Sequence, residues 1–167
     1  MNLLIQSLDT LTEYTGRLLA WFIAAAVLGT VGVVVLRYAM GVNTILLQDL
    51  VMYLHGFAFM LAIPYALKHD AHVRVDLLYS RLGVRGRQIV NLVGHLVLLF
   101  PTGIAMILYS QGYVANAWRI REGSQEVGGI HGVYLLKTLI PAMAVLLMLQ
   151  GLAETLRILR SLGGRDA

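Results

Sequence analysis

The stretch from Lys68 to Leu82 reads KHDAHVRVDLLYSRL and decides the fold of this chain. Lysine, arginine, aspartate and histidine side chains are concentrated in it, whereas long apolar runs lie on both sides. Charged groups are expensive inside a lipid bilayer and gather at its surface. The stretch therefore predicts a polar elbow that joins two membrane-spanning helices.

The composition of the whole chain agrees with a membrane protein. It has 167 residues, no cysteine and 13% charged residues, where soluble domains carry about 25%, and its mean hydropathy is +0.73. A helix needs about 20 mostly apolar residues to cross a hydrocarbon core of about 30 Å, and the sequence offers four such runs. Without cysteine, disulfides, thiolate metal sites and thiol nucleophiles are excluded.

We predict an all-α integral membrane protein with one membrane domain over residues 1–167. Its expected parts are an interfacial helix over 1–17, spans at about 18–36, 49–67, 88–112 and 133–152, and an amphipathic C-terminal tail over 153–167. The third run has no formal charge from Ile89 to Trp118 and would reach about 45 Å as a helix. We therefore expect it to tilt, to kink at Pro101 or to rise out of the bilayer.

Two glycines in the first span leave an alternative open. Gly29 and Gly32 are three residues apart, so they can line a face that another helix approaches closely. Glycine is also generally common in membrane helices, which explains the pair equally well.

Lysine and arginine counts predict the orientation. Nine of them fall on the side of the N-terminus, the elbow and the tail, and four on the other side. Because positive loops stay in the cytoplasm, we expect both termini and the elbow to be cytoplasmic, and the loop from Arg119 to Gly132 to face outward. The net charge of +4 is then a matter of topology and of attraction to membrane lipids, not of nucleic-acid binding.

Enzyme and ion-site signatures are missing from the sequence. Every aspartate and glutamate lies at or outside the ends of the apolar runs, whereas a transporter that couples ions by itself usually holds an ionisable group near mid-depth. No catalytic, cofactor-binding or metal-ligating residues are predicted. Haem is disfavoured because His55 and His95 should lie about 10 Å from opposite faces of the bilayer, although His72 with His95 stays geometrically possible.

The sequence AHVRVDLL, Ala71 to Leu78, resembles a motif of the small membrane subunit of TRAP (tripartite ATP-independent periplasmic) transporters. The resemblance extends to Arg37-Tyr38 after the first span, to the acidic start of the second and to Leu139-Ile140-Pro141 in the fourth. The chain departs from the family before its second span, where Leu47, Gln48 and Asp49 replace the usual tryptophan and paired glutamates.

The resemblance implies a non-catalytic subunit of a sodium-coupled secondary transporter for an organic acid-type solute, in the bacterial inner membrane. Its partners would be a large membrane subunit of elevator type, a periplasmic solute-binding protein and membrane lipids. The small subunit would brace the fixed scaffold of the large one and help dock the binding protein. The alternatives are a free-standing four-span membrane anchor, binding haem or lipid, and a small transporter that works alone.

Three groups of residues carry these expectations. The family-motif elbow consists of His72, Arg74 and Asp76. The candidate outer docking charges are Arg37, Asp49, Arg119, Arg121, Glu122 and Glu126. The candidate lipid-headgroup contacts are Arg17, Arg81, Arg85, Arg87, Arg157 and Arg160. For the elbow, two interpretations remain compatible: it satisfies its own helix ends and binds lipid phosphates, or it clamps the second and third spans against a partner subunit.

Overall fold

The computed structural model describes residues 2–71, 79 and 81–163, and this part of the chain is folded into helices joined by short connections. The elements are α1 (Asn2–Ala39), α2 (Ile45–Lys68), α4 (Val84–Gly94), the π-helical turn η1 (His95–Leu99), α5 (Phe100–Arg119) and α6 (Val133–Leu162). Four segments of the described residues are long and apolar enough to cross a membrane: Ile5–Ala39, Ile45–Lys68, Val84–Arg119 and Val133–Leu162. Each contains one predicted span, so the all-α, four-span fold is confirmed.

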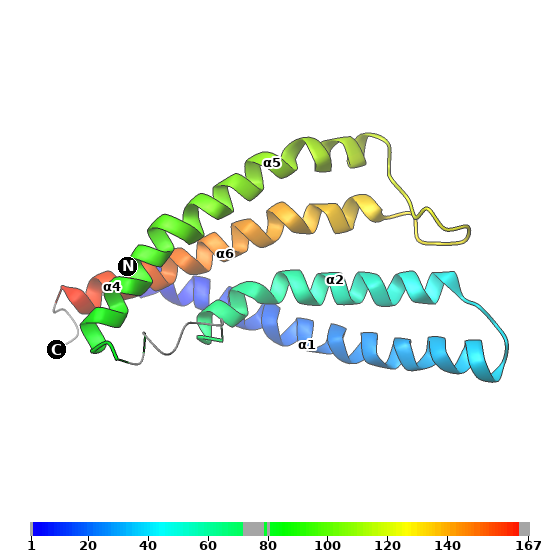
Figure 1. Cartoon of the computed structure of the whole chain (residues 1–167), viewed down its shortest axis with the longest axis horizontal. Helices are drawn as coiled ribbons and strands as arrows, with labels where there is room; N and C mark the ends of the chain where they lie inside the picture. Colours follow the sequence, from blue (N-terminus) through cyan, green and yellow to red (C-terminus); the bar gives the residue numbers. More distant parts are fainter. Residues whose placement is uncertain (1, 72–78, 80, 164–167) are drawn as a thin grey trace.

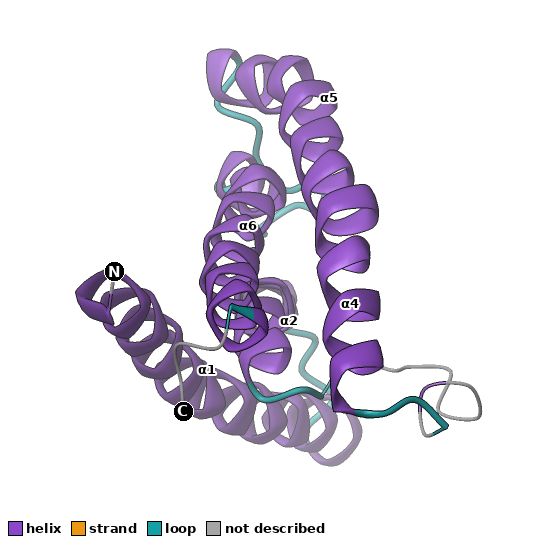
Figure 2. Ribbon diagram, turned by 90° about the vertical axis from the view of Figure 1, so that its left-hand side faces the viewer, coloured by secondary structure: helices purple, strands orange, loops and turns teal. Residues whose placement is uncertain are grey.

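The helices form a curved row rather than a closed square. α1 packs on α2, α2 on α6 and α6 on α5, while α1 also reaches α6 (Figures 1 and 2). The connections 40–44 and 120–132 lie together at one end of the molecule, which we call the loop end. The N-terminus, the end of α6 and the start of α4 lie at the other, the terminal end. α1 and α5 are the outer members of the row and each keeps a face without a neighbouring helix.

Two predicted boundaries lie inside continuous helices. Residues 2–17 run without a break into the first span as part of α1, and residues 153–162 continue the fourth span as the last turns of α6. An apolar chain in lipid must satisfy its backbone hydrogen bonds internally, which favours uninterrupted helices. Whether residues 1–17 lie on the bilayer surface stays a prediction.

The glycine pair of the first span lines a close helix contact. A Cβ added at Gly29 would lie 2.7 Å from Val51 Cγ2, and one at Gly32 would lie 3.6 Å from Leu47 Cδ2. Further along the same helix, a Cβ at Gly16 would overlap the ring of Tyr65. Small residues therefore let α1 and α2 approach each other closely at positions 16 and 29. The packing interpretation is confirmed at Gly29, whereas a Cβ at Gly32 would make only an ordinary contact.

The third helix bends at a π turn that precedes Pro101. The Phe100 N–H donates to the His95 carbonyl five residues back, directly before Pro101, whose ring would clash with the Val97 carbonyl in a regular α-helix. α4, η1 and α5 follow one another directly, and Figure 1 shows the chain changing direction along them. The kink that the sequence predicts near Pro101 is thus realised as a π turn.

Two helices end in the left-handed conformation without glycine. Asp70 has φ +56° after α2 and Arg121 has φ +49° after α5. In each case the next residue closes the helix by a bond to a carbonyl five residues back, from Ala71 to Ala66 and from Glu122 to Ala117. This is the Schellman arrangement, and it fixes where the elbow and the outer loop begin.

Candidate functional site

Polar side chains of the described residues gather at both ends of the row of helices. At the terminal end they form a cluster that we call the terminal network: Asp9, Thr12, Glu13, Arg17, Lys68, His69, Gln150, Glu154 and Arg157. At the loop end they form what we call the loop clamp: Asp49, Tyr113, Trp118, Arg121, Glu122, Ile130, Tyr134, Lys137 and Thr138.

Glu13 is the centre of the terminal network on the α2 side. One of its carboxylate oxygens accepts from Lys68 Nζ at 2.8 Å and lies 3.1 Å from His69 Nε2, and the other accepts from Arg17 Nε at 3.0 Å. Lys68 Nζ also donates to the Asp9 carbonyl at 3.0 Å. Since Lys68 and His69 end α2, one carboxylate ties the first turns of α1 to the last turn of α2.

Gln150 is the centre of the network on the α6 side, and its side chain is only 1% exposed. Its Oε1 accepts from Thr12 Oγ1 at 2.7 Å, while Nε2 donates to Asp9 Oδ1 at 3.2 Å and to Glu154 Oε1 at 3.1 Å. Arg157 completes the cluster, with Nη2 at 2.6 Å from Asp9 Oδ2 and Nη1 at 2.5 Å from Glu154 Oε1. Each polar atom of the buried amide is satisfied, as a group in this environment requires.

Helical spacing explains how these residues meet. Asp9 and Glu13 are four residues apart in α1, and Gln150, Glu154 and Arg157 are spaced by four and three in α6, so each set occupies one face of its helix. The two faces then oppose each other where α1 crosses the ends of α2 and α6. The network links residues up to 148 positions apart, so it is a tertiary feature and not a property of one helix.

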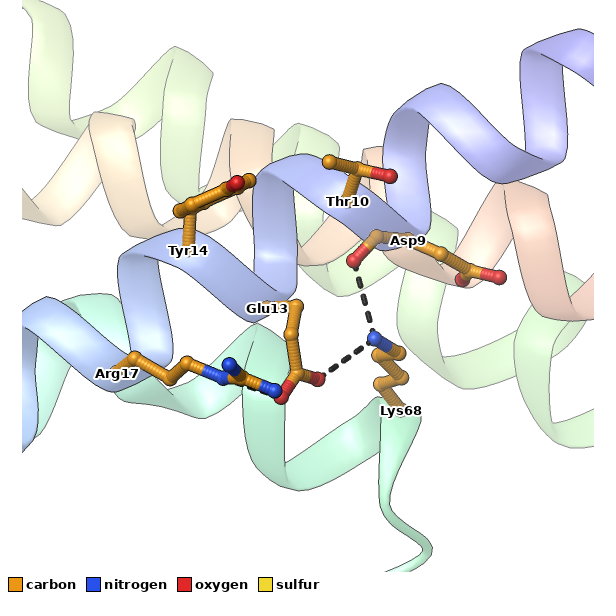
Figure 3. Close-up of a pocket in the computed structure, with 6 residues that line it drawn as sticks. All are labelled: Asp9, Thr10, Glu13, Tyr14, Arg17 and Lys68. Carbon is orange, nitrogen blue, oxygen red and sulfur yellow. Dashed lines mark hydrogen bonds and ion pairs between the residues drawn. The ribbon is translucent and has the colours of Figure 1, made fainter.

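An open cavity of about 270 Å³ lies beside the terminal network on α1. Its lining consists of Asp9, Thr10, Glu13, Tyr14, Arg17 and Lys68. Figure 3 shows that five of these six residues project from α1, while Lys68 reaches in from the end of α2. The cavity therefore has a cationic side and an aromatic side chain next to carboxylates that already have partners.

The loop clamp joins the end of α5 to the start of α6. Lys137 Nζ lies 2.5 Å from Glu122 Oε2 and 4.0 Å from the centre of the Tyr113 ring. Trp118 Nε1 donates to Thr138 Oγ1 at 2.8 Å, and its ring meets that of Tyr134 edge-on at 4.6 Å between centroids. These contacts hold the two helix ends together on either side of the loop.

Asp49 fastens the outer loop to α2. Its side chain is buried, at 9% exposure, and Oδ2 accepts from the Ile130 N–H at 2.9 Å. A Cβ added at Gly129 would come within 2.5 Å of Asp49 Oδ2 and would overlap Ser124 Oγ, so the loop backbone must be glycine there. The chain reversal beyond the anchor is closed by Gly129 N–H donating to the Glu126 carbonyl, with Gly128 at φ +86°.

The sequence matches a known family over most of the chain. The family model described as "Tripartite ATP-independent periplasmic transporters, DctQ component" matches residues 26–161. The chain belongs to this family. No curated protein and no solved structure matches it at the level searched.

Membership in the DctQ family fixes the coarse function. It is a transporter component, and DctQ subunits work with a second membrane component and a periplasmic component in TRAP transporters. With four candidate spans, this DctQ chain is a multi-pass membrane protein. The resemblance predicted from AHVRVDLL is thereby confirmed, although the motif residues His72, Arg74 and Asp76 lie outside the described residues.

The six outer docking charges predicted for this DctQ chain fall into two groups, those with contacts in the loop clamp and those outside it. Asp49 and Glu122 are engaged within the loop clamp, and the Arg121 guanidinium lies 5.9 Å from the centres of both the Trp118 and Tyr134 rings. The remaining three have exposed side chains: Arg37, Arg119 and Glu126. Of these, Arg119 donates to Asn116 Oδ1 at 2.8 Å.

The six arginines predicted to contact lipid headgroups differ in their contacts and in their exposure. Arg157 belongs to the terminal network, and Arg87 donates to the Leu82 carbonyl and lies over the Tyr79 ring. Arg17, Arg81 and Arg85 are exposed, and Arg160 is half-buried. Two of the three histidines weighed for haem have protein neighbours, since His55 stacks on Phe59 and His95 Nδ1 lies 3.0 Å from Thr155 Oγ1. The third, His72, lies outside the described residues.

The terminal network is the feature that sequence reasoning missed in this DctQ chain. Two signals pointed to it: acidic residues four positions apart at Asp9 and Glu13, and the lone amide Gln150 inside an apolar run. Either signal by itself is also typical of a surface helix, because a sequence does not show which helix faces a given polar side chain.

Proposed function

We propose that this chain is the non-catalytic small subunit of a sodium-coupled TRAP transporter for an organic acid-type solute. It braces the fixed scaffold of the large elevator subunit and helps to dock the periplasmic solute-binding protein. Sodium and solute bind to the large subunit. Three features support this assignment beyond family membership: helices tied at both ends, apolar outer faces between them, and an anchored outer loop.

The observation that carries the proposal is the contrast between the ends and the middle of the row. The terminal network and the loop clamp hold the helices at their two ends. Between them, large apolar side chains point outward, among them Ile23, Val27, Val31, Phe59 and Leu108, all at least half exposed. A rigid, apolar, four-helix row suits a brace that adds width to a membrane scaffold and resists tilting.

The placement of the carboxylates supports assigning ion coupling to the partner. In the part of the chain that the structure describes, the aspartates and glutamates belong to the terminal network, the loop clamp or the connections. A sodium or proton site at mid-depth usually needs such a group. The large subunit is therefore the place where we expect the sodium and solute sites.

The outer loop supports the docking role. Asp49 fixes its base, so the tip carrying Glu126 and Val127 keeps a constant position relative to α2. Val127 is 93% exposed, which is unusual for an apolar side chain in a loop facing water. Arg37 in the last turn of α1 and Arg119 at the end of α5 are also exposed, so the loop end offers charged groups and one apolar contact to a soluble partner.

The orientation follows from the charge count. Nine lysines and arginines are expected on the side of the termini and the elbow, against four on the side of the outer loop, which favours cytoplasmic termini. The loop end then faces the periplasm of a bacterial inner membrane, where the binding protein is found. The elbow residues His72, Arg74 and Asp76 would act on the cytoplasmic side, against the large subunit.

Copurification tests this function. The chain is tagged at its C-terminus, solubilised from native membranes in mild detergent and analysed by mass spectrometry. We expect a stoichiometric, many-span membrane protein to accompany it, and uptake in proteoliposomes to require both membrane subunits and the binding protein. A chain that arrives alone under conditions preserving other complexes, or uptake that proceeds equally well without it, would contradict the proposal.

A further inference from the structure

We propose that α1 carries a phospholipid site at the terminal end. The phosphate of the lipid occupies the cavity between Tyr14, Arg17 and Lys68, and the acyl chains lie along the exposed face of the same helix. This inference goes beyond the brace function and does not depend on it, since it requires only that the chain spans a membrane.

Unused donors converge on the cavity. Arg17 contacts Glu13 through Nε only, its side chain is 75% exposed, and within the described part of the chain its two terminal nitrogens have no acceptor. An ammonium group has three donors, of which Lys68 uses two, on Glu13 and on the Asp9 carbonyl. The phenol of Tyr14, 73% exposed, adds a hydroxyl on the other side (Figure 3). A phosphate diester accepts hydrogen bonds from all three groups.

The charges of the network leave Arg17 available. Glu13 already accepts from Lys68 and lies against His69, and Asp9 is held by Arg157 and Gln150. The contact of Arg17 with Glu13 is an exposed i,i+4 pair, which contributes little. The guanidinium can therefore turn to a phosphate without leaving a carboxylate unpaired.

The face of α1 below the cavity fits acyl chains. Tyr14, Leu18, Trp21, Ala25 and Leu28 follow one another at intervals of four and three residues, so they share one side of the helix. Their side chains are exposed, Trp21 at 76% and Leu28 at 72%, whereas the buried residues Leu19 and Ala26 lie toward the other side of the helix. From Arg17 to Leu28 the helix rises about 16 Å, which is about half of a 30 Å hydrocarbon core.

The aromatic residues also mark the depth of the site. Tyr14 and Trp21 are seven residues apart on this face and enclose Arg17 between them. Tyrosine and tryptophan concentrate at the headgroup level of membranes, where a lipid phosphate is found. The site thus joins a polar cavity at headgroup depth to an apolar stripe one leaflet long.

Native mass spectrometry of the full-length chain with its associated subunits tests this site. The delipidated protein is titrated with phosphatidylglycerol, with phosphatidylethanolamine and with diacylglycerol, which lacks the phosphate. We expect both phospholipids to bind and diacylglycerol not to bind. Arg17→Gln should raise the apparent Kd for both about tenfold, because a charge-assisted hydrogen bond is lost. Tyr14→Leu, which leaves every ion pair in place, should raise it about threefold.

Arg37→Gln is the matched control, because Arg37-Tyr38 repeats the same residue types at the other end of α1. The proposal is overturned if Arg37→Gln weakens binding as much as Arg17→Gln, if diacylglycerol binds as tightly as the phospholipids, or if inorganic phosphate at millimolar concentration displaces them. A photo-crosslinking amino acid in place of Trp21 distinguishes a protein occupant. We expect lipid adducts, and a crosslink to another subunit instead would also overturn the proposal.

Discussion

The loop clamp and the terminal network both hold helix ends together, but they do so through different interactions. The clamp relies on a glycine-dependent loop, aromatic rings that meet edge-on, the ion pair of Lys137 with Glu122 and one buried carboxylate that accepts from a backbone N–H. The network relies on ion pairs and a fully satisfied buried amide, shared among α1, α2 and α6. One end is positioned mainly by backbone geometry and the other mainly by side-chain charges.

The difference reflects what each end has to hold. The clamp mainly fixes α5 to α6, which are consecutive in the chain, so a short loop can do most of the positioning, and Asp49 ties that loop to α2 across 81 residues. The network fixes the first turns of α1 to α2 and α6, from which they are separated by 55 to 148 residues. Long side chains that carry charge can reach across such a junction, whereas a loop cannot. Substitutions at the two ends should therefore differ in size and in their response to salt.

The largest effect is expected at the base of the outer loop. Gly129→Val places atoms where Asp49 Oδ2 and Ser124 Oγ lie, so the loop must move and the buried carboxylate loses its donor. A buried charged group that loses its hydrogen-bond donor is destabilised by about 3 kcal/mol. The free energy of unfolding, measured by titration with SDS in mixed micelles, should fall by about that amount.

Gly112→Ala is the control for this change. It lies in α5, where a Cβ would meet nothing within 4 Å, and alanine is favoured over glycine in a helix by about 0.5–1 kcal/mol. Its stability should be equal or slightly higher. Equal losses from both variants would show that the loop anchor has no special role.

The second effect concerns the buried amide of the terminal network. Gln150→Leu leaves the Thr12 hydroxyl and one Asp9 oxygen without their partner, which costs about 1–3 kcal/mol. The double variant Thr12→Val with Gln150→Leu should recover part of the loss, since both members of that pair are then apolar. The same SDS titration checks it, and strictly additive losses would show that the contact between Thr12 and Gln150 is unimportant.

A smaller and salt-dependent effect is expected at Glu13. Glu13→Gln removes the charge that Lys68, His69 and Arg17 share, so the apparent melting temperature should fall at low ionic strength. The difference from wild type should shrink at about 0.5 M salt, because partly exposed pairs are screened. Gly129→Val should lose stability equally at both salt concentrations. A loss at Glu13 that salt does not change would remove the electrostatic distinction between the two ends.

The smallest effects are expected for the exposed outer charges. Arg119→Gln and Glu126→Gln should leave the stability unchanged and weaken binding of the solute-binding protein by about two- to fivefold each, since exposed pairs contribute about 0–1 kcal/mol. Surface plasmon resonance on the reconstituted membrane complex measures this. Arg160→Gln, at the terminal end, is the control and should leave binding unchanged. A matching loss from Arg160→Gln would exclude a specific role for the loop end.

Much of the fold was readable in the sequence because membrane helices are determined locally. The four apolar runs predicted the four spans. A bend near Pro101 was one of three alternatives for the long third helix, and a close helix contact was one of two interpretations of Gly29 with Gly32. AHVRVDLL led to the correct family. The outer docking charges remain a prediction, and the sequence did not separate the anchor Asp49 from exposed Glu126, because burial depends on what packs against each residue.

Length, hydropathy and the positions of glycine and proline thus determined the helices by themselves, since a chain in lipid must close its own backbone hydrogen bonds. Only the tertiary structure decided which polar side chains meet. Asp9, Lys68, Gln150 and Arg157 come together because α1 crosses the ends of α2 and α6, and that crossing is set by side-chain packing between distant segments. Apolar helix faces cannot be told apart in a sequence, so which helix packs on each face is known only from the tertiary structure.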